Sequence, residues 1–322
     1  MKTVVLGAGA LGSILAAYLA RAGLDVALIA RGPRARLLAE RGVTVKGLAD
    51  FTVKVPIIER PAALDACDVF VLTAKTYDTR AALESVRNLK AGMALSVQNG
   101  VVKDEHLAEV FGWDHTAGCI ANFSGEVTED GAVLFTRNEG LYFGELPEGA
   151  SLRTEALAGI LNDAGIKTIV SDRIRSVEWS KYAAWMGLTA VAVLSRLYTH
   201  LVFRDDDLDI LQTQLTREAV GLAAALDIGV IDLGELLLPK TLTEADMDQC
   251  VAVLKRTGEA IEARGATSHR TSVLQDLLRG RRLEIEETFG YAVAKGAEMG
   301  VPMPRLDACY RLVAAIDRNI GA

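Results

Sequence analysis

A glycine-rich turn near the start of the chain limits the fold more than any other feature of the sequence. Gly7-Ala8-Gly9-Ala10-Leu11-Gly12 directly follows a short apolar strand and opens a helical stretch, Ser13 to Arg21. In the dinucleotide fingerprint the first glycine permits a tight turn, the second lets backbone N–H groups approach a pyrophosphate, and the third lets helix and strand pack closely. The helix dipole then faces the phosphates. Glycines at this spacing also occur in ordinary turns, but the strand before and the helix after predict a dinucleotide site. Its residues would be Gly7, Gly9, Ala10, Leu11 and Gly12.

Short apolar runs alternate with amphipathic stretches from Met1 to about Ser171. The runs predict strands, and apolar residues at helical spacing predict the helices between them. The expected strands are Thr3 to Leu6, Asp25 to Ala30, Asp68 to Thr73, Met93 to Val97 and Thr116 to Asn122. The expected helices are Ala10 to Arg21, Pro33 to Arg41 and Thr79 to Leu89. Repeated strand–helix–strand order with continuously apolar strands is typical of a parallel, doubly wound sheet covered on both faces.

The pattern changes between Gly125 and Gly144, where two runs predict hairpin strands that close the far edge of the sheet. Ser151 to Ala164 is expected to form a capped helix. After Ser171 the strand signals end, and the pattern predicts a helical bundle. Its expected helices are Ile174 to Leu197, Asp205 to Leu226, Thr243 to Ala263, Ser272 to Leu278, Glu284 to Met299 and Pro304 to Asn319.

The length of 322 residues corresponds to about two domains of ordinary size. We therefore predict an α/β protein of two domains. Residues 1–170 would form an N-terminal Rossmann-type doubly wound sheet, and residues 171–322 an all-helical C-terminal domain.

Charge and hydropathy exclude several classes of partner. The chain has 35 Lys and Arg against 42 Asp and Glu, a formal net charge of −7, and no basic stripe. We therefore expect no nucleic-acid partner. The most apolar later stretch, Ala183 to Leu194, is shorter than the roughly 18 residues that span a bilayer, so it predicts a buried helix and no membrane partner.

The cysteines and histidines form no metal-site pattern. Cys67, Cys119, Cys250 and Cys309 include no CxxC pair, and the 4 histidines share no metal-ligand spacing. Two disulfides remain an alternative, but scattered thiols in a chain of this size are more often buried and reduced. The amino terminus has too short an apolar run for a signal segment. These features predict a cytoplasmic protein.

The end of the second expected strand indicates which dinucleotide is bound. An enzyme that uses NAD has an acidic residue about 20 residues past the glycines, where it pairs with the ribose 2′-hydroxyl. Here the chain reads Ala30-Arg31-Gly32-Pro33-Arg34 and offers no carboxylate. The guanidinium of Arg31, with help from Arg34, suits a 2′-phosphate, so NADP is favoured as the cofactor. The alternative is that these arginines belong to an ordinary solvated loop.

With these features the chain resembles the ketopantoate reductase (2-dehydropantoate 2-reductase) family over nearly its whole length. The resemblance rests on several short motifs that are specific only in combination. They are the glycine turn, Arg31, Thr73-Ala74-Lys75, Gln98-Asn99-Gly100, Trp179-Ser180-Lys181, Ser272-Val273-Leu274-Gln275-Asp276, Arg279-Gly280-Arg281 and Glu284-Ile285. Family members have a helical C-terminal domain, and the resemblance also implies a homodimer formed through that domain.

Lys75 and Asn99 each follow an expected parallel strand, at the sheet edge where such folds bind ligands. The resemblance implies that Lys75 lies beside the nicotinamide half of the cofactor and that Asn99 contacts the nicotinamide ribose or the substrate. Each residue taken alone is also consistent with an ordinary polar loop.

In the helical half, Lys181 lies in a largely apolar helix, where a charged ammonium needs water or a partner. A surface lysine is the alternative interpretation. The resemblance implies that Lys181 polarises the substrate keto oxygen and donates the proton that accompanies hydride transfer. It also implies that Ser272 holds the substrate carboxylate and that Glu284 anchors polar substrate groups and pairs with the lysine. From sequence alone, Ser272 is equally a helix N-cap and Glu284 an acid in a first helical turn.

Three positions depart from the family pattern. Trp185 and Thr189 stand four and eight residues after Lys181, where family members usually have asparagines that line the substrate pocket. Phe289 stands before Gly290 where a further asparagine is common. All three changes remove amide groups, so the substrate pocket is expected to be narrower and more apolar.

The resemblance therefore implies an NADPH-dependent reductase of a small 2-oxo acid, either a 2-dehydropantoate 2-reductase or a close paralogue. One alternative keeps the fold and the hydride transfer but takes a more apolar ketone or an imine. Another is a protein that senses NADP and has lost catalysis.

Overall fold

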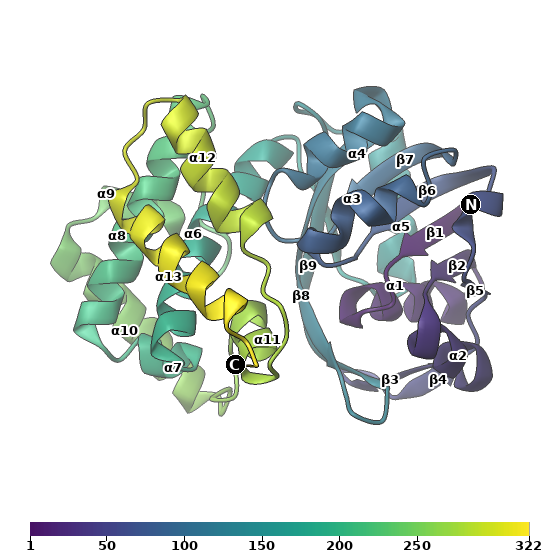
Figure 1. The fold of residues 1–322 in the computed structure, drawn as a ribbon, viewed down its shortest axis with the longest axis horizontal. Helices are drawn as coiled ribbons and strands as arrows, with labels where there is room; N and C mark the ends of the chain where they lie inside the picture. Colours follow the sequence, from purple (N-terminus) through teal and green to yellow (C-terminus); the bar gives the residue numbers. More distant parts are fainter. Residues whose placement is uncertain (322) are drawn as a thin grey trace. The chain divides into compact units, whose positions relative to one another are not determined.

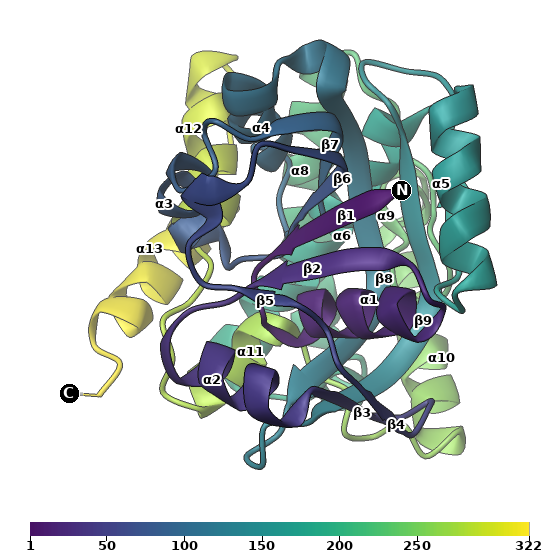
Figure 2. The ribbon, with the colours of Figure 1, turned by 90° about the vertical axis from the view of Figure 1, so that its right-hand side faces the viewer.

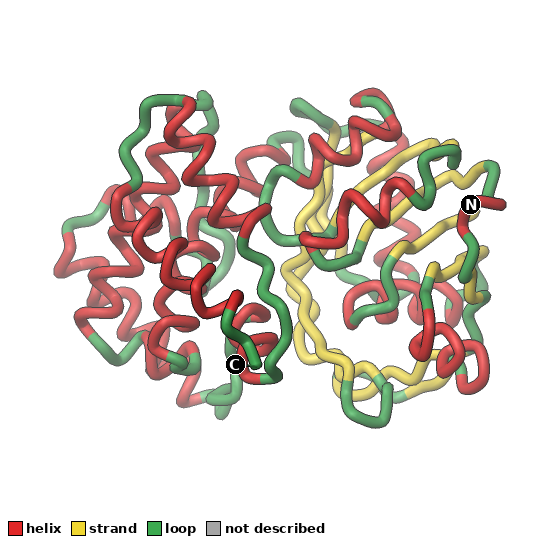
Figure 3. The backbone as a smooth tube through the Cα atoms, viewed as in Figure 1, coloured by secondary structure: helices red, strands yellow, loops and turns green. Residues whose placement is uncertain are grey.

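The computed structural model describes residues 1–321 and divides into two compact units. The first runs from Met1 to Arg175, and the second begins at Ser176. Figure 1 gives the element labels, and Figure 3 shows that the strands occur in the first unit while the second is helical. The predicted fold class, a Rossmann-type α/β half followed by a helical half, is confirmed.

The first unit contains a mixed sheet whose strands alternate with helices over much of its length. Its strands are β1 (Lys2–Leu6), β2 (Asp25–Ile29), β3 (Val43–Gly47), β4 (Phe51–Val53), β5 (Ile57–Ile58), β6 (Ala66–Leu72), β7 (Lys90–Ser96), β8 (Thr116–Val127), β9 (Val133–Glu145) and β10 (Thr168–Val170). Its helices are α1 (Ala10–Arg21), α2 (Gly32–Arg41), α3 (Thr79–Glu84), α4 (Lys103–Phe111) and α5 (Leu152–Asp163), with short 3₁₀ turns at Pro61–Ala63, Thr76–Asp78 and Trp113–His115.

The sheet order is β4-β3-β9-β8-β7-β6-β1-β2-β5, and β10 pairs with β9 outside this path. The segment from β5 to β8 is parallel throughout, with Val5 opposite Leu28 on one side and Val71 on the other. The carboxyl ends of β1, β6 and β7 therefore meet at one edge, which is where a doubly wound sheet binds ligands.

Apolar residues on both faces of the sheet explain why its strands are continuously hydrophobic. Val5 and Val71 belong to a core with α1, α2 and α5, whereas Leu6 and Phe70 belong to a second core with α3 and α4. Figure 2 shows α1 and α5 on one side of the strands and α3 and α4 on the other. Successive residues alternate between the two cores because side chains of a strand alternate between faces.

A hairpin is present in this region, but its turn follows Val127, inside the first predicted run, and its expected place at the far edge is wrong. β8 and β9 pair antiparallel from Ala117–Glu145 to Val127–Val133. The sheet continues beyond them, because β3 pairs with Val133 to Phe135 and β10 with Leu141 to Phe143. The long β9 thus pairs with two short strands, β3 and β10, and the sequence predicted neither of them. The capped helix predicted after the hairpin is confirmed, with Ser151 and Thr154 forming a capping box at the start of α5.

The second unit is a helical bundle into which α6 runs from the end of the first. Its helices are α6 (Ile174–Ser195), α7 (Thr199–Val202), α8 (Asp206–Ala225), α9 (Pro239–Glu244), α10 (Met247–Ala263), α11 (Ser272–Leu278), α12 (Tyr291–Glu298) and α13 (Pro304–Arg318), with a π-helical turn at Glu286–Gly290. None of the helices that the structure describes combines the length and apolar character needed to cross a bilayer.

Two predicted helices are interrupted. The helix expected from Thr243 to Ala263 is two helices, since Asp246 forms a capping box with Gln249 that starts α10. The helix expected from Glu284 to Met299 begins later, with the π-turn at Glu286, so Glu284 is not a first-turn acid of an α-helix.

Candidate functional site

The glycine turn lies between β1 and α1, and close packing requires two of its glycines. Gly7 has a φ of +118°, and a Cβ there would lie 2.7 Å from the Ala74 nitrogen. A Cβ on Gly12 would lie 2.0 Å from the Gly7 carbonyl oxygen. These distances are far below van der Waals contact. The first and third glycines thus meet the packing demands that the fingerprint predicts.

Gly9 has the opposite surroundings. It is the N-cap residue of α1, and no described side chain caps that helix end. Apart from its neighbours in the turn and the backbone of α1, a Cβ added to Gly9 would meet no heavy atom of residues 1–321 within 4 Å. The Cβ position of Gly9 therefore faces open space, beside the uncapped first turn that includes Ala10 and Leu11. This arrangement fits the pyrophosphate of a dinucleotide.

Arg34 holds the glycine turn in place. Its Nε donates to the Ala8 carbonyl oxygen at 3.1 Å, and its Nη2 donates to the Ser13 hydroxyl at 3.2 Å. Its Nη1 donates to the Gly131 carbonyl oxygen, in the β8–β9 hairpin loop, at 2.6 Å. All three guanidinium nitrogens of Arg34 thus bind the fold, and its expected help in binding a 2′-phosphate stays a prediction.

Arg31 lies in a more accessible place. It is the N-cap residue of α2, two residues past the end of β2, and its side chain is exposed. No acidic residue lies at this strand end. Arg31 is thus the cation at the position where a dinucleotide fold reads the adenosine ribose.

Lys75 and Asn99 follow β6 and β7, whose carboxyl ends are neighbours in the sheet. Gln98 directly precedes Asn99, and the sequence indicated no role for it beyond its place in the Gln98-Asn99-Gly100 motif. Its side-chain amide donates to the Ala74 carbonyl oxygen and to the Thr79 hydroxyl, both at 2.8 Å. Gln98 is 6% exposed, and its amide oxygen accepts from Ser96. The structure therefore joins the segment of Lys75 to the segment of Asn99 through one buried side chain.

In the second unit, Lys181, Trp185 and Thr189 follow one another at intervals of four residues on α6 and share one side of the helix. Thr189 is buried, and its hydroxyl has no hydrogen-bond partner among the described residues. The hydroxyl of Ser180, next to Lys181, donates to Ser176 and accepts from the Ile231 nitrogen at 2.8 Å.

The other predicted residues of this unit lie in two later segments. The N-cap of α11 is Thr271, whose hydroxyl accepts from the Leu274 nitrogen, so the capping role considered for Ser272 is wrong. Glu284 is buried before the π-turn, and its carbonyl oxygen accepts from the Thr288 hydroxyl at 2.7 Å.

The structure brings two of the three departures from the family pattern together. The rings of Trp185 and Phe289 have centroids 5.5 Å apart and are tilted by 36°. Phe289 is fully buried, and Trp185 is 9% exposed. The two rings form one buried apolar contact, in which Trp185 lies one helical turn beyond Lys181 on α6.

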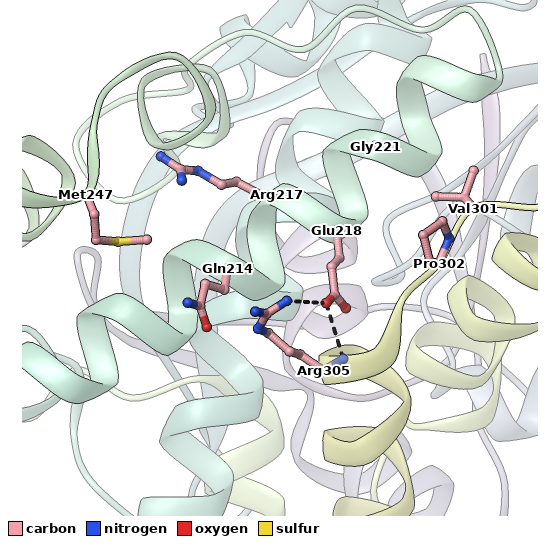
Figure 4. A pocket seen from close by; sticks show the side chains of 8 residues that line it. All are labelled: Gln214, Arg217, Glu218, Gly221, Met247, Val301, Pro302 and Arg305. Carbon is pink, nitrogen blue, oxygen red and sulfur yellow. Dashed lines mark hydrogen bonds and ion pairs between the residues drawn. The ribbon is translucent and has the colours of Figure 1, made fainter.

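A separate hollow of about 480 Å³ lies in the second unit and contains none of the predicted residues. Its lining residues are Gln214, Arg217, Glu218, Gly221, Met247, Val301, Pro302 and Arg305 (Figure 4). The Glu218 carboxylate accepts from the backbone nitrogens of Arg305 and Leu306 at 3.2 and 2.9 Å, and also from the Arg305 guanidinium at 3.3 Å. Glu218 thus caps α13 from α8, and the hollow marks a junction of helices.

The four cysteines are buried and unbridged. Within residues 1–321, no three His, Cys, Asp or Glu side chains are grouped so that they could hold a metal ion.

Two family models match the chain, one in each half. The model described as ketopantoate reductase PanE/ApbA matches residues 3–148, and its C-terminal counterpart matches residues 173–317. The chain belongs to the ketopantoate reductase family. It is therefore an oxidoreductase of the ketopantoate reductase type, which acts on a CH–OH group.

A named relative agrees with this membership. A 2-dehydropantoate 2-reductase of Pyrococcus abyssi is 31% identical over 306 residues, which are 94% of each chain. The ternary structure of D-mandelate dehydrogenase with NADH and anilino(oxo)acetate has a TM-score of 0.85 at 20% identity and covers 100% of both chains. A dimeric ketopantoate reductase from Staphylococcus aureus has a TM-score of 0.77 at 18% identity, again over 100% of both chains. These two structures share the fold.

Proposed function

We propose that the chain is an NADPH-dependent reductase of a small 2-oxo acid, with Lys181 as the proton donor. The observation that carries the cofactor assignment is the open space at Gly9, in a turn whose other two glycines are closely packed. Family membership supports the reaction, and the relatives named 2-dehydropantoate 2-reductase support the substrate class. When bound, the reduced nicotinamide supplies a hydride to the substrate carbonyl carbon.

The residues of the first unit would bind the cofactor. Backbone N–H groups from Gly9 to Gly12, at the start of α1, would bind the pyrophosphate. Arg31 would form a charge-assisted contact with the 2′-phosphate of NADPH. Lys75 and Asn99, aligned through Gln98, would bind the nicotinamide half and the substrate.

The residues of the second unit would act on the substrate. The Lys181 ammonium would donate its proton to the carbonyl oxygen as negative charge develops there. Ser272 would hold the substrate carboxylate, while Glu284 would anchor polar substrate groups and orient the lysine. Trp185 and Thr189 would line the substrate side of α6.

The Trp185–Phe289 contact favours a second candidate substrate. Trp185, packed on Phe289, offers an apolar ring rather than an amide group, and an apolar ring gains by contact with an apolar substituent. We therefore include 2-oxo acids with an aromatic or branched apolar group. The anilino(oxo)acetate of the D-mandelate dehydrogenase structure is an example of an acid with an aromatic group.

We also propose a homodimer, by analogy with the dimeric relative from Staphylococcus aureus. Light scattering on the purified chain at several concentrations tests this, and a monomer mass throughout contradicts it. The buried, unbridged cysteines support a reducing, cytoplasmic location, which fractionation of the source cells tests.

The function is tested by oxidation of NADPH and of NADH with purified protein. The acceptors are ketopantoate, a panel of apolar 2-oxo acids and a panel of imines. We expect turnover of at least one 2-oxo acid with NADPH, at a kcat/KM on the order of 10⁴ M⁻¹s⁻¹ or more. Tight NADPH binding without turnover of any acceptor contradicts the proposal and favours a sensing protein. Turnover of imines alone contradicts the substrate class.

A further inference from the structure

A tyrosine of α6 contacts the backbone of the segment that follows Glu284. The Tyr182 hydroxyl donates to the Thr288 carbonyl oxygen at 2.5 Å, across 106 residues of sequence. The same hydroxyl has a hydrogen bond with the backbone of Ala292, which lowers its pKa as an N–H donor does. In an uninterrupted α-helix, the Ala292 N–H would bind the Thr288 carbonyl directly. The phenol therefore contacts both of the groups that a regular helix would join.

This insertion explains why the chain forms a π-turn at Glu286–Gly290. A side chain that enters the i→i−4 ladder is one of the known causes of a helix irregularity. Within the turn, the Gly290 nitrogen donates to the Ile285 carbonyl oxygen at 3.0 Å, which is the i→i−5 bond of a π-helix. The side chains before the turn thus point in other directions about the helix axis than they would in a continuous helix.

Those residues include Glu284. Its carbonyl oxygen accepts from the Thr288 hydroxyl at 2.7 Å, so its backbone is tied to the residue that Tyr182 holds. The next residue after Thr288 is Phe289, which packs on Trp185. Tyr182 and Trp185 are three residues apart on α6, and Lys181 directly precedes Tyr182. Two neighbouring side chains of α6 therefore fix the π-turn beside the helix that carries Lys181.

Burial keeps the phenol in its donor form. Tyr182 is 2% exposed, and burial raises its pKa well above the ordinary value. Its ring also packs against that of Trp179 in a T-shaped arrangement, with centroids 5.6 Å apart. The hydroxyl is thus held in one place in its neutral form across the range in which a reductase works.

We propose that Tyr182 is a positioning residue, whose hydroxyl maintains the π-turn and thereby fixes Glu284 relative to Lys181. This inference rests on the proposed function, in which both of those residues act on the substrate.

The test is Tyr182→Phe in the full chain, assayed with the best acceptor of the wild type. Without the hydroxyl, the Ala292 N–H and the Thr288 carbonyl can bind each other, so no buried polar group is orphaned and the melting temperature changes little. Closing the π-turn to an α-turn rotates the preceding residues about the helix axis by the angle of one residue, about 100°. We expect kcat to fall about tenfold or more, while the Kd for NADPH stays within about twofold, since a small misplacement of catalytic groups is costly.

Tyr310→Phe is the matched control. Tyr310 donates to the Glu286 carboxylate at 2.8 Å, so this variant removes a phenol contact to the same turn without touching the backbone ladder. Its kcat is expected to equal that of the wild type.

A double-mutant cycle with Glu284→Gln identifies the route of the effect. If Tyr182 acts through Glu284, Tyr182→Phe adds little to the loss caused by Glu284→Gln, whereas independent roles give losses that multiply. Amide exchange of residues 286–292 in the NADPH-bound protein gives a readout without turnover, and it should change in Tyr182→Phe alone. Unchanged kcat, multiplicative losses or unchanged exchange overturns the inference. An inactive wild type instead contradicts the proposed function, and the catalytic part of this inference with it.

Discussion

The side-chain amide of Gln98 donates to the Ala74 carbonyl oxygen at 2.8 Å and thereby joins the ends of two neighbouring parallel strands. Each strand end carries one proposed ligand-binding residue, Lys75 after β6 and Asn99 after β7. A buried amide with both ends satisfied fixes the spacing of two loops more strictly than apolar packing does, because the loss of either bond leaves a polar group without a partner.

We expect Gln98→Met to lower kcat/KM by about tenfold or more, because the two loops lose their alignment. The Ala74 carbonyl and the hydroxyls of Thr79 and Ser96 would lose a buried partner, so the free energy of unfolding should fall by about 1–3 kcal/mol. Steady-state kinetics and urea unfolding measure both effects. Ser96→Ala removes the contact on the amide oxygen and the bond from the Gln98 backbone nitrogen at 3.2 Å but keeps both bonds that the amide nitrogen donates, so it should have the smaller kinetic effect. Full activity in Gln98→Met would show that the alignment does not matter.

Much of the first unit could be predicted because its central strands are buried on both faces and read as unbroken apolar runs. The missed strands are short and lie toward the sheet's sides. β5 has only Ile57 and Ile58, and β3 alternates with polar Thr44 and Lys46. Such strands are ordered by pairing with β2 and β9, so their own residues carry little signal. α4 was missed because it begins with the charged residues Lys103, Asp104 and Glu105.

The glycine turn offers a test that separates ligand space from packing. We expect Gly9→Ala to leave stability within about 1 kcal/mol of the wild type, because its Cβ meets open space and only N-cap preference is lost. Its affinity for NADPH should nevertheless fall by about tenfold or more, since the methyl group would occupy space needed by the pyrophosphate. Gly7→Ala, at a φ of +118°, should instead destabilise the fold itself. Fluorescence titration and thermal melts compare the two variants. Normal NADPH binding by Gly9→Ala would contradict the proposed pyrophosphate site.

The two arginines after β2 should have distinct effects on cofactor binding. Arg31→Glu is expected to weaken NADPH by about tenfold or more and to spare NADH, because the new carboxylate repels a 2′-phosphate. Arg34→Lys keeps the charge but cannot reproduce the three contacts to Ala8, Ser13 and Gly131, so both cofactors should weaken by a similar factor. The Kd values for NADPH and NADH in each variant decide the matter. A selective loss of NADPH affinity in Arg34→Lys would show that Arg34 does bind the 2′-phosphate.

In the second unit, long-range contacts explain most of what the sequence did not predict. The break before α10 had a local signal, since Asp246 and Gln249 have capping-box spacing, but the apolar period continues across it. The π-turn had none, because its cause is Tyr182, far away in sequence. The same contact fixes the orientation of Glu284. The motif around Lys181 could thus be found from sequence, while the residue that we propose to position its partner could not.

We expect Lys181→Ala to lower kcat by about 10²–10⁴-fold, because the variant removes the proposed general acid. The Kd for NADPH should change little, since the proposed cofactor residues belong to the other unit. Presteady-state mixing with a 2-oxo acid, together with a fluorescence titration, measures the two quantities separately. A variant that loses mainly cofactor affinity would show that Lys181 is not the proton donor.

Asp209 should make stability depend on pH. Its side chain is fully buried in α8, and neither carboxylate oxygen has a hydrogen-bond partner among the described residues. Burial, followed by the charge of Asp206, raises its pKa from 3.8 to about 8, against a smaller opposing effect of Lys255. The folded chain therefore holds a proton that the unfolded chain releases above about pH 4, so the free energy of unfolding should fall by up to about 1.4 kcal/mol per pH unit between pH 4 and 8 and then level off.

Asp209→Asn should remove this slope and stabilise the chain at pH 8, whereas Asp207→Asn, at an exposed site on the same helix, should keep it. Urea unfolding across this pH range measures the slope, and an unchanged slope in Asp209→Asn would mean that the carboxyl is ionised in the folded chain.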